Sequence, residues 1–266
     1  MRILAPFKVG PDLEALAESD WSPGPDMRVE TRYARNILNP LDESALELAL
    51  RFRDQARALG LPVELQAVSI GGEGLSAAAK TLLALKFDRV RRLAGEAPLF
   101  HPELVASLLA AEVRAYEADL VVMGGQSADG DNAQTPLILA ELLKWPVLTQ
   151  VTAFEPLPEG GLAATSLEDD GLARHTRPLP LCLAIGNAAA WLRVPTLKDR
   201  LEYGRREIEV VPAAAVPASA APGPGAVLTA LKPVDSRRAG LVLEGRDGQA
   251  LAARLYAEFL KERLRP

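Results

Sequence analysis

The sequence contains little cysteine and histidine, no excess of positive charge and no long apolar run. A single cysteine, Cys182, among 266 residues cannot form an internal disulfide, which points to a reducing cytoplasm. The net charge of -5 leaves no basic excess to neutralise phosphates, so nucleic acid is not the expected main partner. No apolar run approaches the length of a membrane span, and the N-terminal run is too short for a signal peptide. We therefore expect a cytoplasmic protein without membrane insertion.

Motifs for bond chemistry are scarce as well. The sequence has no HExxH, GxSxG, GxxxxGK[ST] or GxGxxG and no cluster of Cys or His. His101 begins a predicted helix, where capping or solvation is expected, and His175 lies in a strand-like segment without nearby carboxylate spacing. Cys182 lies in the apolar PLCLAI and is expected in the core. Asp129 and Asp131 could bind Mg²⁺, although Asp in a Gly-rich loop more often makes Asx turns. These features predict a ligand-binding chain that performs no bond chemistry.

What the sequence does have is a regular alternation of β-rich and helical segments. The apolar fraction of 48% excludes disorder for most of the chain. Such alternation predicts βαβ units, an α/β fold and a doubly wound, mostly parallel sheet covered on both faces. The expected strands are residues 2–7, 27–34, 62–70, 89–94 and 118–123. The expected helices are residues 39–60, 75–85, 102–117 and 136–145.

The pattern changes after Trp145. Period-2 runs separated by turn residues predict antiparallel strands over residues 146–186, attached to the same sheet. A basic turn or short helix and a strand follow at residues 195–211. We therefore expect a nucleotide-binding domain at 1–211, a Pro/Ala linker at 212–226 and a C-terminal arm at 227–266. The arm ends in an amphipathic helix, which either folds back on its own domain or embraces another subunit. The apolar face of this helix carries Leu251, Leu255, Phe259 and Leu260.

Three strand-to-helix junctions are candidate ligand sites: residues 8–12, 69–74 and 124–135, the last reading GGQSADGDNAQT. In a doubly wound sheet such junctions share the carboxyl edge, where ligands bind. Glycine permits close backbone approach, and exposed N–H groups at a helix start offer a neutral anion site. Both a nucleotide-like ligand and an ordinary tight turn fit these features.

Several segments together resemble the β subunit of electron transfer flavoprotein. The N-terminal ILAPFKVGPD resembles the family's strand followed by VKxVPD, and AVSIGG resembles its VSxGP turn. The segment NPLDESALELALRF resembles NPxDExAxEEALRL, and RRAGLVLEG resembles the end of the family's sequences. The longest match is LVVMGGQSADGDNAQTPLILAELLKWPVLTQV, which resembles LxxGxQAxDGDxxQTGxxLAExLxWPxxTxV. Pro136 stands where the family usually has Gly, and it cannot donate an N–H to a phosphate.

The resemblance implies an adenine-nucleotide α-hydrolase-like fold and a heterodimer whose α subunit holds the redox-active FAD. The β chain would bind a structural AMP, or a second FAD in electron-bifurcating relatives, and it would contact the α subunit through its C-terminal arm. Electrons would leave the FAD to a membrane quinone oxidoreductase or another acceptor. The cofactor contacts implied are Pro6, Asn39, Pro40, Leu41, Asp42, Ile70, Gly124, Gly125, Gln126, Ser127, Ala128, Asp129, Gly130, Asp131, Asn132, Ala133, Gln134 and Thr135.

The resemblance also implies a docking loop for acyl-CoA dehydrogenases of fatty acid oxidation and related enzymes. The family's NEPRYxxL becomes AWLRVPTL here, which leaves the identity of the partner dehydrogenase open. Leu197 matches the leucine that serves as the family's hydrophobic anchor. For the basic residues that flank it, the alternative is an ordinary charged surface exposed to solvent. The implied docking residues are Arg193, Thr196, Leu197, Lys198 and Arg200.

Two other classes of protein compete with this interpretation. One is an adenine-nucleotide-hydrolysing or adenylating enzyme of related fold, against which the missing lysine and catalytic dyad argue. The other is a stand-alone nucleotide sensor, which the C-terminal arm disfavours.

Overall fold

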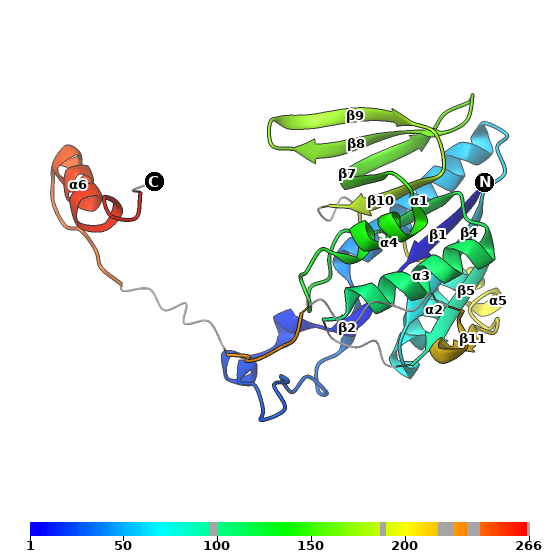
Figure 1. The fold of residues 1–266 in the computed structure, drawn as a ribbon, viewed down its shortest axis with the longest axis horizontal. Helices are drawn as coiled ribbons and strands as arrows, with labels where there is room; N and C mark the ends of the chain where they lie inside the picture. Colours follow the sequence, from blue (N-terminus) through cyan, green and yellow to red (C-terminus); the bar gives the residue numbers. More distant parts are fainter. Residues whose placement is uncertain (96–99, 187–189, 218–225, 233–239, 265–266) are drawn as a thin grey trace. The chain divides into compact units, whose positions relative to one another are not determined.

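A computed structural model describes residues 1–95, 100–186, 190–217, 226–232 and 240–264 (Figure 1). Contacts within the chain divide it into a larger unit, Met1–Leu231, and a smaller unit, Lys232–Pro266. The domain boundaries expected from the sequence stay a prediction. Residues 218–225 of the expected linker and 237–239 of the RRAGLVLEG segment lie outside the described residues.

In the larger unit, the described strands form a nine-stranded sheet in the order β11-β5-β4-β1-β6-β10-β7-β8-β9. Neighbouring strands from β11 to β7 run parallel, whereas β8 and β9 are antiparallel additions. The predicted doubly wound α/β fold is therefore confirmed. The strands are β1 (Arg2–Pro6), β4 (Glu64–Ile70), β5 (Arg89–Ala94), β6 (Leu120–Gly124), β7 (Val147–Pro156), β8 (Leu162–Glu168), β9 (Gly171–Arg177), β10 (Leu181–Ile185) and β11 (Glu209–Pro212).

Helices cover both faces of this sheet, as Figure 1 shows. Side chains alternate along β1, so that Ile3 and Ala5 pack with α1 and α2, whereas Leu4 packs with α3 and α4 on the opposite face. Central strands such as β6 are buried on both faces, which explains their continuous apolar sequence. The helices are α1 (Pro40–Ala58), α2 (Ser76–Ala84), α3 (Pro102–Tyr116), α4 (Thr135–Leu143) and α5 (Leu197–Glu202), with short 3₁₀ turns η1 (Leu13–Ala15), η2 (Glu18–Trp21), η3 (Glu73–Leu75) and η4 (Ala213–Ala215).

The strand predicted at residues 27–34 is wrong. The chain turns there instead, with the Gly24 N–H donating to the Arg28 carbonyl and Met27 at a positive φ of 56°. The β structure begins later, at β3 (Asn36–Leu38), which pairs antiparallel with β2 (Val9–Pro11) in a separate two-stranded ribbon. Alternating polarity in this segment reflects an exposed loop, not a half-buried strand.

The prediction of antiparallel strands over residues 146–186 is also wrong for β10 and for its pairing with β7. β10 inserts between β6 and β7 and runs parallel to both. All five of its residues are buried, as expected for a strand covered on both faces. The apolar run LCLAI therefore indicated a central parallel strand, and only β7 with β8 and β8 with β9 form the expected antiparallel pairs.

The smaller unit contains α6 (Gly248–Leu255), which continues into a π-helical turn, η5 (Tyr256–Leu260). Asp247 caps α6, because its carboxylate accepts from the Gln249 N–H at 2.9 Å. The predicted helix is therefore present at the end of the chain. The described residues of this unit bury none of their side chains fully.

Candidate functional site

A cavity of about 430 Å³ opens at the carboxyl edge of the sheet, over β1, β4 and β6. Its wall includes residues 6–9, 68–72 and 123–127, which end or follow these three strands. β4 and β6 lie on opposite sides of β1, so the cavity marks the point where the chain changes direction across the sheet. Ligands of open α/β sheets bind at such switch points.

The cavity brings together most of the residues that the resemblance assigned to a cofactor. Those in its wall are Pro6, Asn39, Asp42, Ile70, Gly124, Gly125, Gln126, Ser127, Asp129, Gly130, Asn132 and Thr135. Among the residues that the structure describes, the wall does not include the predicted Pro40, Leu41, Ala128, Asp131, Ala133 and Gln134. A cofactor contact by any of these residues stays a prediction.

Asn39 precedes α1, but its side chain does not cap the helix. Its Nδ2 donates to the Gln126 carbonyl at 3.0 Å, and its Oδ1 accepts from the Ala128 N–H at 3.3 Å. The side chain therefore ties the start of α1 to the loop after β6. The Asn39 side chain bonds the backbone of that loop instead of the first turn of α1. A capping rule based on neighbouring residues does not take such a distant partner into account.

Asp42, in the first turn of α1, is buried between the ends of β1 and β6. Its two carboxylate oxygens accept from the Lys8 N–H and the Gly124 N–H, each at 2.9 Å. Burial raises the pKa of Asp42 to about 6, against the lowering effect of Asn39 and these two N–H donors. One carboxylate thus joins β1, β6 and α1 beneath the cavity.

Gly124 is required where β6 meets α1. A Cβ at this position would lie 2.5 Å from the Asp42 Oδ1 and 3.0 Å from the Asp42 backbone nitrogen. Gly125 is similarly constrained, because a Cβ there would lie 3.0 Å from the Ile185 carbonyl oxygen of β10. The paired glycines of the loop therefore permit close backbone packing at the cavity.

The rest of the loop holds a strained conformation. Asp131 and Ala133 have φ values of 44° and 50°, in the left-handed region that non-glycine residues rarely adopt. An Asx turn is present, but Asn132 makes it by accepting from the Gln134 N–H at 3.2 Å. Backbone strain of this kind concentrates at binding and active sites.

Lys8 supplies the positive charge that the loop itself lacks. Its Nζ lies 2.7 Å from the Asp129 Oδ1 and 3.5 Å from the Ser127 Oγ, and all three residues line the cavity. Burial raises the pKa of Asp129, but the Lys8 ammonium, together with hydrogen bonds from Ser127 and the Asp129 N–H, holds that pKa below its usual range. The carboxylate that the sequence suggested as a Mg²⁺ ligand is thus paired with an ammonium.

Sequence reasoning placed Lys8 at a candidate junction but did not assign it to the site. The signal for it was its place directly after β1, because β1 and β6 end at the same edge of the sheet. Ser69, at the end of β4, lies in the candidate junction 69–74 but was likewise not assigned to the site. Its buried Oγ lines the cavity and has no hydrogen-bond partner among the described residues.

The remainder of the wall is largely apolar. It includes Val9, Val68, Leu75, Val105, Leu109 and Met123. A volume of this size lies within the range of about 300–1,000 Å³ typical of small-molecule sites. An apolar wall combined with the Lys8 ammonium and the carboxylates of Asp42 and Asp129 suits a flat, partly polar small molecule.

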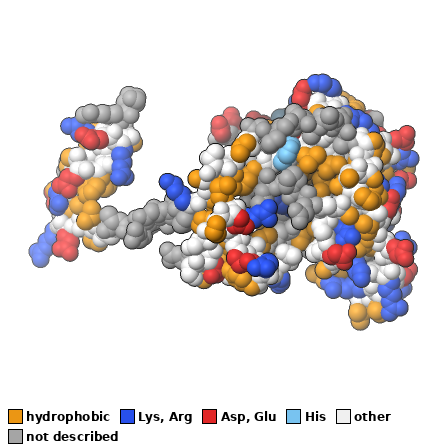
Figure 2. All heavy atoms as spheres, turned by 60° about the horizontal axis from the view of Figure 1, so that its bottom comes forward, with side chains coloured by type: hydrophobic (Ala, Val, Ile, Leu, Met, Phe, Trp, Pro, Cys, Tyr) orange, Lys and Arg blue, Asp and Glu red, His pale blue; other side chains and the backbone are white. Residues whose placement is uncertain are grey.

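The predicted docking residues lie in and before α5, outside the cavity wall. Thr196 caps α5, accepting from the Asp199 N–H at 3.1 Å, and Leu197 is 73% exposed. Lys198 and Arg200 are also exposed. Arg193 is exposed as well, but its guanidinium pairs with Glu47 and Asp54 of α1. On the face drawn in Figure 2, Lys and Arg lie among Asp and Glu, without a broad field of one sign.

The histidines and the cysteine lie largely as expected. The His101 Nδ1 caps α3, accepting from the Leu104 N–H at 3.2 Å, and the side chain also lines the cavity. Cys182 is buried in β10, where burial raises the pKa of its thiol to about 12. For His175 the expectation was wrong, because the pairing of β8 with β9 brings Glu168 to 3.2 Å from its Nε2.

The fold and the cavity define a doubly wound α/β protein with a cavity at its switch point. Residues 26–216 match the family model of the electron transfer flavoprotein domain. The chain is 32% identical to "Putative electron transfer flavoprotein subunit YgcR" of Escherichia coli (strain K12), over the full length of both proteins. It is 32% identical to the electron transfer flavoprotein subunit beta of Bos taurus, over 70% of this chain and 72% of that protein. The corresponding protein of Dictyostelium discoideum is 29% identical over 68% of this chain and 70% of that protein.

This chain therefore belongs to the electron transfer flavoprotein family, and it resembles the β subunits of that family. Membership implies a role in electron transfer, association with a flavin and an α-subunit partner. Within the part of the chain that the structure describes, no helix is both long enough and apolar enough to cross a membrane.

Proposed function

We propose that this chain is the β subunit of a cytoplasmic, heterodimeric electron transfer flavoprotein that binds AMP in the cavity over β1, β4 and β6. The observation that carries the proposal is the convergence of residues 6–9, Asn39, Asp42 and residues 124–127 on that cavity. The apolar wall suits an adenine base, and the loop amides with Lys8 suit a single phosphate. The chain itself performs no bond chemistry.

In this proposal the α subunit holds the redox-active FAD, and the β chain helps to enclose it. Acyl-CoA or related dehydrogenases, as in fatty acid oxidation, dock at the exposed residues around α5 and reduce the flavin. Electrons then pass to a quinone oxidoreductase or another acceptor. Support comes from the exposure of Leu197 on a segment whose sequence resembles the docking loop of the family.

The nucleotide content of the heterodimer tests the proposal. The chain is co-expressed with its α subunit, bound nucleotides are released with acid, and the products are identified by chromatography. We expect one AMP and one FAD per heterodimer. Two FAD would instead identify an electron-bifurcating member, and ATP turnover by the purified chain would support the adenine-nucleotide-hydrolysing or adenylating alternative.

Thermal unfolding of the nucleotide-free chain gives a second test. A ligand that binds only the folded state stabilises it by about 3 to 4 kcal/mol at 100 to 1,000 times its Kd. We expect added AMP to raise Tm in a concentration-dependent way. Adenosine, which lacks the phosphate, is the matched control and should have a smaller effect at equal concentration.

A further inference from the structure

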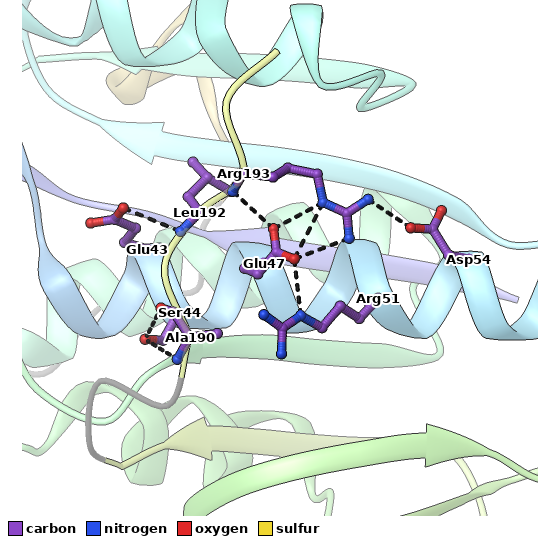
Figure 3. Close-up of polar contacts among 8 residues, drawn as sticks. All are labelled: Glu43, Ser44, Glu47, Arg51, Asp54, Ala190, Leu192 and Arg193. Carbon is purple, nitrogen blue, oxygen red and sulfur yellow. Dashed lines mark hydrogen bonds and ion pairs between the residues drawn. The ribbon is translucent and has the colours of Figure 1, made fainter. Parts of the chain in front are cut away.

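Residues 190–193, which lead into α5, lie along α1. Side chains of α1 form hydrogen bonds with the backbone of these residues (Figure 3). The Ser44 Oγ donates to the Ala190 carbonyl at 2.7 Å and accepts from the Ala190 N–H at 3.3 Å. Two residues further along the segment, the Leu192 N–H donates to the Glu43 Oε1 at 3.2 Å. Side chains of α1 thus satisfy backbone groups of a segment more than 140 residues away in the sequence.

Glu47 is the centre of this attachment. Its buried carboxylate accepts from the Arg193 backbone N–H at 3.0 Å. It also accepts from the Nε and the Nη2 of the Arg193 side chain, and the shortest N–O distance is 3.0 Å for each of these two nitrogens. The Arg51 Nε approaches it from α1 itself at 2.9 Å, and the Arg193 Nη1 lies 2.7 Å from the Asp54 Oδ2. A buried carboxylate is tolerated only when it is paired and hydrogen-bonded in this way.

The attachment controls which side chains face outward. Ala190 and Pro195 are buried, whereas Trp191, Val194 and Leu197 are 77%, 79% and 73% exposed. Three large apolar side chains thus stand on a backbone that is itself held in place. Presenting apolar side chains from a fixed backbone reduces the entropy lost on binding.

We propose that Ser44 and Glu47 are positioning residues for docking: they hold residues 190–193 in the conformation that presents Trp191, Val194 and Leu197 to a partner protein. The proposal rests on the proposed docking function of this segment. It assigns a functional consequence to two side chains of α1 that do not themselves face the partner. It also means that α1 borders the proposed nucleotide cavity at Asp42 and, further along the helix, holds the docking segment.

Hydrogen exchange of the α–β heterodimer tests the attachment without any dehydrogenase. In Glu47→Gln the carboxylate charge is lost while the size of the side chain is kept. Because a hydrogen bond to a charged group is stronger than one to a neutral group, we expect exchange over residues 190–203 to accelerate about tenfold or more. Exchange of β6 and α3 should stay at the wild-type rate.

Arg51→Gln is the matched control, because Arg51 contacts Glu47 from α1 but forms no hydrogen bond or ion pair with residues 190–193, all of which the structure describes. It should leave the exchange of residues 190–203 unchanged. Unchanged exchange in Glu47→Gln, or accelerated exchange spread over the whole larger unit, would overturn the proposal. If Glu47→Gln does not fold, Ser44→Ala tests the same attachment, since it removes only the hydroxyl bonded to Ala190.

The kinetics of electron transfer distinguish the positioning role of Ser44 and Glu47 from the docking function of the segment itself. A purified acyl-CoA dehydrogenase with its acyl-CoA substrate is titrated with the heterodimer. We expect Glu47→Gln to raise KM for the heterodimer several-fold at unchanged kcat and unchanged flavin content, and Arg51→Gln to change neither constant. Unchanged KM in Glu47→Gln despite faster exchange would also overturn the positioning role. Leu197→Ala should raise KM without faster exchange; if it changes neither, the docking function fails while the exchange result still stands.

Discussion

Gly124 lies where β6 passes closest to the N-terminus of α1, and the contact leaves no room for a side chain. In Gly124→Ala the new Cβ would meet the Asp42 carboxylate at 2.5 Å and backbone atoms at 3.0 Å. Overpacking of this kind costs about 1–3 kcal/mol, and we expect that loss in the free energy of unfolding measured with urea. Gly72→Ala is the control: it lines the same cavity, its φ is negative and its Cβ would meet nothing within 4 Å. Equal losses in both variants would contradict the close contact as the cause.

Lys8 and Asp129 form an ion pair in the cavity wall, so removing the ammonium leaves a carboxylate facing any bound anion. We expect Lys8→Gln to weaken AMP binding about tenfold or more, in line with the strength of charge-assisted hydrogen bonds. Isothermal titration of the nucleotide-free protein with AMP measures the change. Lys144→Gln removes an exposed lysine that pairs with Glu141, away from the cavity, and should leave Kd unchanged. Equal affinities in the two variants would exclude a role for Lys8.

The buried Asp42 should make stability depend on pH. Its folded-state pKa, about 6, lies above the ordinary value of 3.8, so its contribution is fully present below pH 3.8 and is lost as the pH rises through 6. At 1.36 kcal/mol per unit, the loss approaches about 3 kcal/mol relative to a group that does not titrate. The difference in unfolding free energy between wild type and Asp42→Asn should therefore shift against the wild type between pH 4 and pH 8. A difference that stays constant over that range would contradict a raised pKa.

At the scale of single residues, the sequence predicted which residues line the cavity better than it predicted the residues that they contact. Asn39, Asp42 and Gly124 belonged to recognisable segments, and all three line the cavity. Their partners could not be predicted, because Asn39 bonds a loop 87 residues away and Lys8 pairs with a residue 121 positions away. Those contacts follow from strand order, which local patterns do not encode.

At the scale of elements, periodicity predicted the helices well and misplaced some strands. The helix expected at 39–60 is α1 (Pro40–Ala58), and the strand expected at 89–94 is β5 (Arg89–Ala94). The failures have a common physical origin: a five-residue apolar run such as β10 carries no periodicity that tells parallel from antiparallel pairing. Similarly, alternation at 27–34 is satisfied by an exposed loop as well as by a strand.

The segment before α5 illustrates an element whose exposed face calls for a partner. Leu197 begins α5 and is 73% exposed, so its truncation should cost the fold little. We expect Leu197→Ala to slow reduction of the heterodimer by an acyl-CoA dehydrogenase while leaving its flavin content unchanged, as measured by stopped-flow absorbance. Leu172→Ala, at a residue 69% exposed on β9, is the control and should not slow reduction. Loss of flavin in Leu197→Ala would instead assign that leucine a structural role.

At the scale of the whole molecule, the two units differ in how they are stabilised. Every buried hydrophobic side chain of the described residues lies between Ile3 and Ala190, within the larger unit. The smaller unit has an amphipathic helix, with Leu255 and Tyr256 44% and 54% exposed. A helix this short is marginal in water without tertiary packing, so its apolar face calls for a surface on which to pack.

A chain ending at Leu231 separates these roles, because it keeps the whole described core and the cavity wall. We expect the truncated chain to match the full chain in its urea unfolding midpoint and AMP affinity, since it keeps every buried hydrophobic side chain of the described residues. Co-purification with the α subunit should fall sharply, because the arm is the element expected to contact that subunit. The control replaces residues 232–266 with a Gly/Ser segment of equal length, which should behave like the truncated chain. Undiminished co-purification would show that the arm is dispensable for assembly, and a lowered unfolding midpoint would show that it folds back on its own unit.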